Sequence, residues 1–587
     1  MSILIGLALG ILFGLLAKLA GKSWIYLPLF VLGNVFWSYI YLPTLQYGFK
    51  DIPFIILLNG VALAVLSSGY SIFGQSGRQS RSKSKTSKNK IAYSVLGLGF
   101  IAFFVLPFAT SFAGFFSDKY YALPGEISSG EFSKDVEAID MSQVRRVDGS
   151  LARKLADKRL GEDRGLGSRV EVGRMSIQVV DGQLYWVGPL NHSKFRRWLD
   201  NRAGTPGYVM VSASNENDVR LVLDVQGSPL NIRYNMGAYF GDKPARYVYD
   251  HGYATHGLTD WTFEIDDTGR PFYIITDYKK RIGFKGADAV GVVVFDVQSG
   301  ELTSYSIEEA PVWIDRIQPA RFMRKQLDDW GQYKDGWMNA WLGAEGVLQT
   351  TEGMSLVYGS DGQSYFYTGM QSVGADEGTI GFILINTRTK AMRLYEQAGA
   401  TEIAARNSAQ DEFQDFGYRA TNPILYNIGG VPTYFMTLKA DSGLVKSVAF
   451  VSVEDYGLVG SGKTTEAALR NYSQALRGRG NSIAIGDVEN YQNIEGSVVR
   501  FRQETIDQTV TYYVLLAGAP DRLFAIPSDL APMVRMTEIG DQLSLAYQED
   551  SASVVNVLEF ENKTLSLRRS ETQIEIDEQI EGSQGEP

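Results

Sequence analysis

An apolar stretch near the N-terminus decides the first part of the fold: Ile3-Leu-Ile-Gly-Leu-Ala-Leu-Gly-Ile-Leu-Phe-Gly-Leu-Leu-Ala-Lys-Leu-Ala20. Three further apolar stretches follow within the first 117 residues, at Trp24–Leu42, Ile52–Phe73 and Ile91–Phe116. Each is close to the ~20 residues that an α-helix needs to cross the ~30 Å hydrocarbon core of a bilayer. Residues 1–117 are therefore predicted to form a bundle of four membrane-spanning helices.

The charges beside these stretches predict the orientation of the bundle. The loop between the third and fourth stretches, residues 75–90, carries six Lys or Arg residues and no acid. Short cytoplasmic loops are the ones that carry an excess of Lys and Arg. The 75–90 loop is therefore predicted to be cytoplasmic, in a plasma membrane, with the N-terminus and everything from Asp118 onward on the extracytoplasmic side.

The charge balance of the two parts narrows the choice of partners. Residues 1–117 hold nine Lys or Arg residues and one acid, Asp51, whereas the remaining residues hold 47 basic and 65 acidic ones. An acidic ectodomain disfavours nucleic acid as a partner. The chain has no cysteine, which excludes disulfides, thiolate catalysis and Cys-ligated metal sites. No cofactor is expected.

Small and polar residues within the apolar stretches indicate how the helices pack. Gly6, Gly10 and Gly14 recur every four residues and share one helix face, so another backbone can approach closely there. That backbone belongs either to the same bundle or to a second subunit. Asn34 and Asn59 lie mid-span, and an amide in hydrocarbon needs a partner, so both are expected to face the bundle interior and each other. No ionisable residue lies mid-span, which disfavours ion-coupled transport.

The ectodomain contains an irregular internal repeat. A turn glycine followed by an aromatic or apolar strand occurs at Gly182, Gly269, Gly362 and Gly430, and each copy predicts a β-hairpin. A second apolar strand follows each hairpin, beginning near residues 207, 291, 381 and 447. The copies are 87, 93 and 68 residues apart. This uneven spacing favours tandem α+β modules with helical insertions over an irregular β-propeller.

The predicted organisation follows from these patterns. Helices are expected at Ser193–Arg202, Pro319–Leu342, Glu402–Glu412 and Thr464–Arg477. The predicted domains are the transmembrane bundle (1–117), a charged helical connector (118–170), α+β ectodomain with the first repeats (171–345), α+β ectodomain with the later repeats (346–570) and an acidic tail (571–587). The fold class is a four-span helical bundle with a large strand-rich α+β ectodomain of tandem irregular repeats.

The repeat units resemble a known type of module. A strand leading into a turn such as Phe295-Asp-Val-Gln-Ser-Gly-Glu301 resembles PepSY-like modules of bacterial envelope proteins. The run that includes Gly257-Leu-Thr-Asp-Trp and Ala310-Pro-Val-Trp-Ile-Asp-Arg316 resembles long bacterial multi-span envelope proteins. The resemblance covers mainly residues 150–480. It implies a membrane-anchored envelope protein and no catalytic residue.

One stretch matches a nucleotide-binding motif. Gly457-Leu-Val-Gly-Ser-Gly-Lys-Thr464 has the P-loop spacing, in which Gly457, Gly462, Lys463 and Thr464 would hold phosphate and Mg²⁺. The predicted extracytoplasmic location and the hairpin-rich surroundings disfavour that function, because a P-loop belongs to βαβ units. The favoured interpretation is a Gly-rich turn from a strand into a helix, with Thr464 or Thr465 as its N-cap.

Aromatic and histidine residues give weaker signals. Trp330, Trp337 and Trp341 follow a helical spacing with Tyr333, which indicates either core packing between repeats or contact with a partner, a glycan or the headgroup layer. His192, His251 and His256 are the only histidines. His251 and His256 are five residues apart without a fixed acidic neighbour, so no metal site is predicted.

These patterns predict a non-enzymatic, membrane-anchored scaffold or binding protein outside the cytoplasm. It is expected to assemble through its bundle, either as a homo-oligomer or within an envelope protein complex, with the membrane as a partner. Two alternatives stay open at this point. One is a pore or transport subunit in which Asn34 and Asn59 line a path, and the other is a P-loop enzyme in an inverted topology.

Overall fold

The structure, a computed structural model, describes residues 1–68, 84–136, 139, 143–163, 165–343, 345–359, 362–373, 378–477, 491–506, 509–528, 530, 532–548 and 554–565. The chain divides into two compact units, residues 1–457 and 458–587. Most of the predicted cytoplasmic loop, residues 75–83, and the predicted acidic tail, 571–587, lie outside the described residues.

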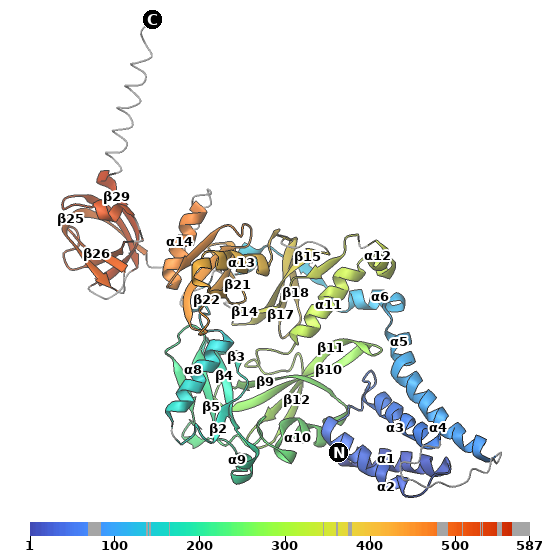
Figure 1. Ribbon diagram of the computed structural model, residues 1–587. Helices are drawn as coiled ribbons and strands as arrows, with labels where there is room; N and C mark the ends of the chain where they lie inside the picture. The colour runs from blue at the N-terminus through green and yellow to red at the C-terminus, as the bar shows by residue number, and fades with distance from the viewer. Residues whose placement is uncertain are drawn as a thin grey trace. The chain divides into compact units, whose positions relative to one another are not determined.

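Helices form the N-terminal part of the first unit, at the predicted places (Figure 1). Their bounds are α1 (Ser2–Leu19), α2 (Tyr26–Tyr41), α3 (Asp51–Ser67) and α4 (Ser84–Phe100), which continues through the π-helix η1 (Ile101–Val105) into α5 (Leu106–Ser111). α1 packs on α2, and α3 packs on α4. Among the described residues, two helical segments are both long and apolar enough to cross a membrane, Ser2–Leu19 with 18 residues and Lys90–Ser111 with 22.

The other two predicted spans are shorter than expected as helices. α2 has 16 residues and α3 has 17. The fourth predicted span also ends early, since Phe112 has extended backbone (φ −72°, ψ 123°) and a separate helix, α6 (Ala113–Ala122), follows. A bundle of four full-length spans is therefore not shown, and the fold class that the structure does show is mixed α and β.

Four larger sheets dominate the rest of the first unit, one for each predicted repeat, and their described strand pairs are antiparallel except for the parallel pair of β1 and β18 in sheet 3. Sheet 1 contains β2 (Val170–Val172), β3 (Ser176–Val180), β4 (Gln183–His192), β5 (Tyr208–Ser212) and β6 (Val219–Val222). Sheet 2 contains β9 (Gly257–Ile265), β10 (Pro271–Ile282), β11 (Lys285–Asp296) and β12 (Leu302–Ser306). Sheet 3 contains β1 (Ile127–Ser129), β13 (Leu348–Thr350), β14 (Ser355–Tyr358), β15 (Ser364–Ser372), β17 (Gly381–Asn386) and β18 (Met392–Tyr395). Within the first unit, sheet 4 contains β20 (Arg419–Ala420), β21 (Ile424–Ile428), β22 (Val431–Lys439) and β23 (Val445–Ser452).

The four predicted turn glycines close the first hairpin of each sheet. Gly182, Gly269, Gly362 and Gly430 have φ values of +73°, +87°, +73° and +88°. Residues with a Cβ rarely adopt this left-handed conformation, so glycine is required for turns of this kind. The repeat inferred from the sequence is confirmed at the level of these hairpins.

A shared irregularity in the first strand strengthens the repeat. In sheets 1, 3 and 4 this strand is split in two, as β2 and β3, β13 and β14, and β20 and β21, and both pieces pair with the same neighbour. In sheet 2 the strand is continuous but bulges opposite Ile274 and Thr276, beside Asp260 with φ +52°. Each copy thus has extra residues at one point of its first strand, which bends the strand there.

The sheets pack side by side in a ring (Figure 1). Sheets 1 and 2 share a core that includes Val187 and Phe295. α11 (Ala320–Tyr333) joins sheets 2 and 3, since its Phe322 contacts Tyr278 of β10 and also packs in the core of sheet 3.

The ring is completed by sheet 4. The hydroxyls of Tyr367 in sheet 3 and Tyr434 in sheet 4 share a hydrogen bond of 2.5 Å. Sheet 4 returns to sheet 1 through α8 (Gly149–Glu162), whose N-cap Asp148 pairs with Lys439 of β22 at 2.5 Å. The uneven spacing of the copies favoured tandem modules over a propeller in the sequence analysis. In the structure, helices inserted between the sheets account for the uneven spacing, and the four sheets still form a ring that resembles a propeller.

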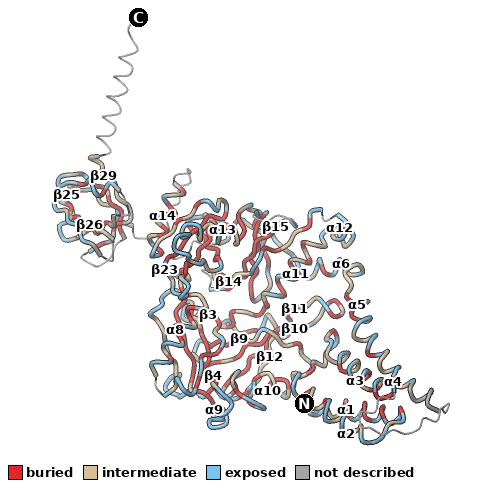
Figure 2. The backbone as a smooth tube through the Cα atoms, in the orientation of Figure 1, coloured by how far each residue is buried: buried red, intermediate tan, exposed pale blue. Residues whose placement is uncertain are grey.

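Most of the inserted helices lie close to where the sequence predicted them, namely α9 (Phe195–Asp200), α11, α12 (Gly336–Leu342) and α13 (Glu402–Asp411). A further helix, α10 (Pro244–Asp250), was not predicted. The helix predicted over 319–342 is broken, because Lys334 ends α11 and Gly336 adopts φ +81°. Figure 2 shows burial concentrated in the sheets, whereas much of the N-terminal helical surface is exposed.

The second unit combines a strand and helix with a small barrel. β24 (Val459–Gly462) leads into α14 (Thr465–Arg477). The barrel closes in the order β25 (Tyr491–Ile506), β26 (Thr509–Leu516), β27 (Leu523–Pro527), β29 (Val554–Asn562) and β28 (Gln542–Gln548). Only β27 and β29 are parallel among its described pairs, as in Greek-key barrels of the OB type. The domain predicted over 346–570 is therefore corrected, because its last part is a barrel and not a further repeat.

Candidate functional site

A cavity of about 550 Å³ lies between sheets 1, 3 and 4. The β3–β4 turn, β14, the β17–β18 hairpin and β21 contribute to its wall, together with residues from the segment 128–145 that precedes α8. Apolar and aromatic side chains dominate the lining, including Leu184, Leu356, Leu384, Phe132, Tyr395 and Tyr426. Polar side chains such as Arg145, Asn386 and Asn427 also line it, and a concave site of this size that combines apolar walls with polar groups is typical of small-molecule binding.

Arg145 supplies the main polar feature of the cavity. Its backbone N–H donates to the Tyr426 hydroxyl at 3.2 Å, and its Nη1 donates to the Leu356 carbonyl at 3.3 Å. These two bonds anchor the residue to sheets 3 and 4. Its Nε is buried with no hydrogen-bond partner among the described residues, and no carboxylate there forms an ion pair with it. The guanidinium thus keeps hydrogen-bonding capacity for an anionic or carbonyl group.

A second arginine at the wall is already paired. Arg393 of β18 lies 3.0 Å from the Asp135 carboxylate at the end of α7 (Phe132–Asp135). The Arg393 side chain is half-exposed, so this pair contributes little to stability. Arg145 is therefore the lining cation that has no carboxylate partner among the described residues.

Two buried carboxyl groups lie directly behind the cavity wall. Asp315 Oδ2 accepts hydrogen bonds from the Val179 N–H at 2.8 Å and the Tyr358 hydroxyl at 3.3 Å, and both of those residues line the cavity. The Asp315 N–H lies 3.4 Å from Glu264 Oε2. Burial raises the pKa of Asp315 to about 7, with a further contribution from the Glu264 charge. Burial also raises the pKa of Glu264.

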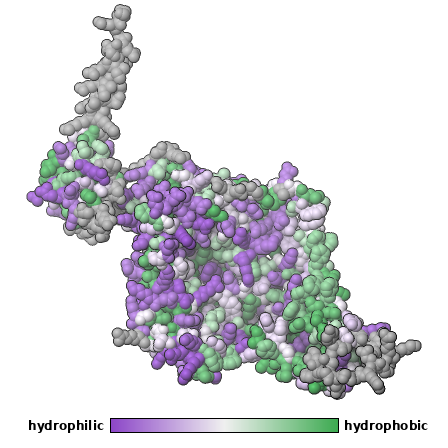
Figure 3. Space-filling view, viewed as in Figure 1, coloured by the Kyte–Doolittle hydropathy of each residue, from purple (hydrophilic) through white to green (hydrophobic). Residues whose placement is uncertain are grey.

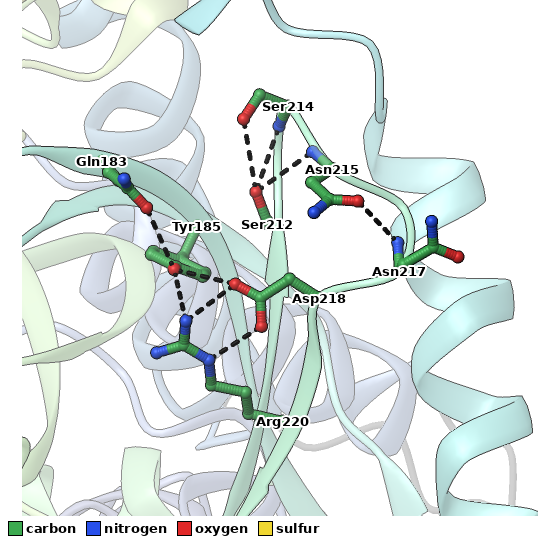
Figure 4. A network of polar contacts seen from close by, with 8 residues as sticks. All are labelled: Gln183, Tyr185, Ser212, Ser214, Asn215, Asn217, Asp218 and Arg220. Atoms are coloured by element: carbon green, nitrogen blue, oxygen red, sulfur yellow. Dashed lines mark hydrogen bonds and ion pairs between the residues drawn. The ribbon is translucent and has the colours of Figure 1, made fainter. Parts of the chain in front are cut away.

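Another polar network in sheet 1 is closed upon itself (Figure 4). The Tyr185 hydroxyl donates to Asp218 at 3.0 Å, and Arg220 donates to Asp218 at 2.8 Å and to the Tyr185 oxygen at 2.9 Å. Hydrogen bonding from Arg220 lowers the pKa of Asp218. The three side chains satisfy one another's hydrogen-bonding groups at the end of the strands. The network therefore stabilises the turn before β6, and we do not regard it as a candidate site.

The predicted glycine face packs within the chain. A Cβ at Gly6 would lie 2.5 Å from the Cα of Val35, and one at Gly10 would lie 2.5 Å from the Cα of Val31. At Gly14 it would meet the Leu27 side chain. All three glycines therefore contact α2, which favours the interpretation as packing inside one bundle. The face is filled and is not the surface through which a second subunit assembles.

Asn34 and Asn59 pair as expected. Each amide donates to the other side chain at 3.0 Å, and each also donates to a carbonyl one turn earlier in its own helix, that of Phe30 or Ile55, at 2.9 Å. Both residues are buried. All four amide N–H groups are used, so these side chains offer no free donor to a permeating solute.

The P-loop match adopts a different structure. Residues 459–462 form strand β24, not a phosphate-binding loop, and Thr464 caps α14 by accepting from the Ala467 N–H at 3.2 Å. The glycines allow the strand to approach the helix, since a Cβ at Gly460 would meet the Tyr472 backbone and one at Gly462 would lie 2.6 Å from the Ala468 nitrogen. Lys463 is exposed. The predicted N-cap is confirmed, and packing explains Gly460 and Gly462.

Two of the three tryptophans of the predicted helical face pack against other aromatic side chains, and the third is exposed. Trp330 stacks on Tyr121 at 6.4 Å, and Trp337 meets Phe112 edge-on at 5.5 Å. Both thus fix α11 and α12 onto the segment that follows the apolar helix. Trp341 stacks on Trp337 and is 67 % exposed.

The histidines do not form a metal site in the described part of the chain. His251 stacks on Tyr247, and His256 Nδ1 lies 2.7 Å from Asp277 Oδ2. Burial lowers the pKa of His192. No group of three or more His, Asp or Glu side chains suited to a metal ion occurs among the described residues.

Sequence reasoning missed Arg145, Glu264 and Asp315. One signal was present, because Ala310–Arg316 combines charged and apolar residues outside any predicted strand. Their proximity to one another depends on ring closure, however, which brings Tyr358 within 3.1 Å of the Ile177 carbonyl in another sheet.

Known proteins give no further guidance on this site. No protein-family model, curated protein or solved structure matches the chain. The resemblance to PepSY-like envelope proteins therefore stays a prediction.

Proposed function

We propose that this protein is a membrane-anchored binding protein whose ectodomain, outside the cytoplasm, holds a small ligand with an apolar body and one anionic group. The observation that carries the proposal is the cavity between sheets 1, 3 and 4 with the Arg145 guanidinium at its wall, which has no carboxylate partner among the described residues. Arg145 is half-buried, and a cation that is partly removed from water attracts an anionic group more strongly than an exposed one, because water screens the pair less. Binding, and not catalysis, is the function that this arrangement supports best.

The surface of the N-terminal helices supports the membrane anchor. Leu32, Phe36 and Phe108 are 66, 69 and 62 % exposed, although an aqueous surface rarely presents contiguous apolar patches of large size. Figure 3 shows hydrophobic residues gathered over the helical part, beside a mostly hydrophilic ectodomain surface. Lipid is the environment in which such a surface is stable, and all four helices are proposed to span the bilayer.

Contacts at the helix ends support the proposed topology. The N-terminal amine lies 3.0 Å from Asp250, the Pro43 carbonyl accepts from the Tyr249 hydroxyl at 2.6 Å, and Ser111 Oγ accepts from the Phe284 N–H at 2.7 Å. The start of α1, the loop between α2 and α3 and the end of α5 therefore all meet the ectodomain. An N-out, C-out bundle with the basic 75–90 loop in the cytoplasm has this arrangement.

The alternatives have less support. Asn34 and Asn59 satisfy each other, which disfavours a pore lined by them, and β24 with α14 disfavours a P-loop enzyme. A homo-oligomer or envelope complex is still proposed, but through a surface other than the Gly6, Gly10 and Gly14 face. Mass photometry of the full chain in mild detergent tests that part.

Charge-matched probes test the binding function. We expect 4-phenylbutyrate to raise the melting temperature of the full chain in nanodiscs, and 4-phenylbutylamine to leave it unchanged, because only the carboxylate complements Arg145. The Arg145→Gln variant should lose the response to 4-phenylbutyrate. Arg146→Gln is the matched control, since Arg146 does not line the cavity, and it should keep the response.

Two results would refute the binding function as stated. One is an equal response to the acid and the amine in the wild-type chain. The other is a response to the acid that persists unchanged in Arg145→Gln.

A further inference from the structure

α12 presents an unusual surface for a helix of an aqueous domain. None of its seven residues is buried. Its exposed apolar side chains are Met338, Trp341 and Leu342, with exposed fractions of 57, 67 and 67 %. These three side chains together form one continuous apolar face. In the described part of the chain, no neighbouring strand or helix covers this face.

The position of α12 links this face to the membrane anchor. Trp341 stacks on Trp337 at 5.4 Å, and Trp337 meets Phe112 at 5.5 Å, directly after the apolar segment Lys90–Ser111. Phe115 of α6, in the same region, is 70 % exposed. Figure 1 shows α12 beside α6 at the end of α5, and Figure 3 shows hydrophobic surface over this region.

The fold holds α12 in this position. α11 is fixed to α6 by the contacts of Trp330 with Tyr121 and of Tyr333 with Tyr120. Gly336, with φ +81°, then turns the chain between α11 and α12. A residue with a Cβ would be strained at this φ, so the break is built into the sequence.

Cations also lie on the hairpin that contacts this end of the anchor. The tip of the β10–β11 hairpin carries Lys279, Arg281 and Lys285, all exposed, of which Arg281 is paired with Asp288 at 3.1 Å. The backbone of this tip reaches the anchor, because the Phe284 N–H donates to Ser111 Oγ at 2.7 Å. Basic groups beside aromatic and apolar ones are the combination found at the boundary between headgroups and acyl chains.

We propose that α12 is an interfacial helix that inserts Met338, Trp341 and Leu342 into the outer leaflet beside the anchor, with the hairpin cations at the level of the lipid phosphates. The inference rests on the membrane anchorage in the proposed function. It goes beyond that function because it assigns the lipid surface as the partner of a specific ectodomain face. The contact fixes the ectodomain close to the bilayer and limits its rotation about the anchor.

Lipid-borne quenchers test this contact, and the absence of cysteine in the chain makes single-cysteine labelling clean. The sites are Trp341→Cys, with Met338→Cys as a second probe that keeps Trp341 in place. Phe416→Cys is the matched control, since Phe416 is 68 % exposed but belongs to η5 (Gln414–Phe416) after α13. Phe104→Cys, within the apolar helix, reports on the anchor itself. Each full-chain variant is labelled with bimane and reconstituted in nanodiscs with or without 5-doxyl phosphatidylcholine.

We expect the quencher to lower bimane fluorescence about twofold at positions 338, 341 and 104, because interfacial and buried residues lie among the acyl chains. Position 416 should be unaffected. Quenching at 104 with none at 338 and 341 would overturn the inference and leave the anchor intact. Absence of quenching at all four positions would overturn the anchorage in the proposed function. Labels at 338 and 341 that are shielded from lipid in a particle of doubled mass would show that a second copy covers α12 instead.

Discussion

At the scale of single residues, glycines determine how closely the first two helices, α1 and α2, can pack, because glycine has no side chain to separate the two backbones. A methyl group added at Gly10 would lie 2.5 Å from the Cα of Val31, whereas one added at Gly33 of α2 would have no atom within 4 Å apart from the nearby backbone of its own helix. Gly10 and Gly33 lie in adjacent apolar helices. Replacing each of them with alanine therefore distinguishes the effect of close packing, which applies at Gly10, from the effect of helix propensity, which applies at both.

We predict that Gly10→Ala destabilises the full chain by roughly 1–3 kcal/mol, because the added methyl group overpacks the contact with Val31. Gly33→Ala should be neutral or stabilising by up to ~1 kcal/mol through helix propensity. Thermal unfolding in the same detergent compares them. Equal effects of the two substitutions would contradict the close packing of α1 on α2.

The buried carboxyl of Asp315 makes stability depend on pH. Burial raises its folded-state pKa from 3.8 to about 7, so between these values the folded chain binds a proton that the unfolded chain lacks. Stability from this group is therefore present below pH ~4 and decreases as the pH rises to ~7, by at most ~1.4 kcal/mol per pH unit.

We predict that Asp315→Asn reduces this loss, so the variant gains stability relative to the wild type as the pH rises from 5 to 8. Glu264 still contributes a decrease of the same sign, because burial also raises its pKa. Denaturant unfolding of both chains at four pH values measures the difference. Asp267→Asn, at an exposed turn, is the control, and identical slopes for Asp315→Asn and this control would refute the prediction.

Predictions about single residues succeeded where the hydrogen-bond partner of a side chain is determined by nearby sequence or by an apolar environment that offers few partners. Asn34 and Asn59 have few partners available in an apolar bundle, so their pairing could be predicted from the sequence. Arg145 could not be identified in this way. Its significance comes from a cavity formed by three sheets that are far apart in the sequence.

At the scale of elements, the stretch that matches the P-loop motif forms the strand β24 and the start of the helix α14, and it does not form a phosphate-binding loop. We predict that Thr464→Ala accelerates amide hydrogen exchange in the first turn of α14 about fivefold, because loss of an N-cap costs ~1 kcal/mol. Lys463→Ala should leave exchange unchanged, since Lys463 is exposed and is not the cap.

Nucleotide titration completes that comparison. The full chain should show no heat of binding with ATP and Mg²⁺ in isothermal titration calorimetry, and Lys463→Ala should not differ from it. Micromolar affinity that disappears in Lys463→Ala would restore the P-loop interpretation.

The hairpins and helices could be predicted because their signals are local. Turn glycines and alternating apolar residues identified Gly182, Gly269, Gly362 and Gly430, and periodicity identified α13 within one residue at its C-terminus. The barrel of the second unit was missed. Its strands β27 and β29 are parallel and distant in the sequence, and no local pattern indicates a pairing of that kind.

At the scale of the whole molecule, composition predicted the division into an apolar helical part and an acidic ectodomain. It could not predict the ring, because contacts such as that between Tyr358 and Ile177 join residues 181 positions apart. Insertions such as α11 and α13 also obscured the repeat period. The ring nevertheless positions the one feature that supports ligand binding, the cavity with Arg145.

The central claim is that this ring stands outside the cytoplasm on a helical anchor, and labelling of single cysteines in intact cells tests it most directly. A membrane-impermeant thiol reagent is applied to Phe416→Cys, on the ectodomain surface, and to Ser80→Cys, in the basic loop. We predict that Cys-substituted position 416 is labelled in intact cells and that position 80 is labelled only after permeabilisation. Labelling of position 80 in intact cells, with position 416 protected until permeabilisation, would contradict the account.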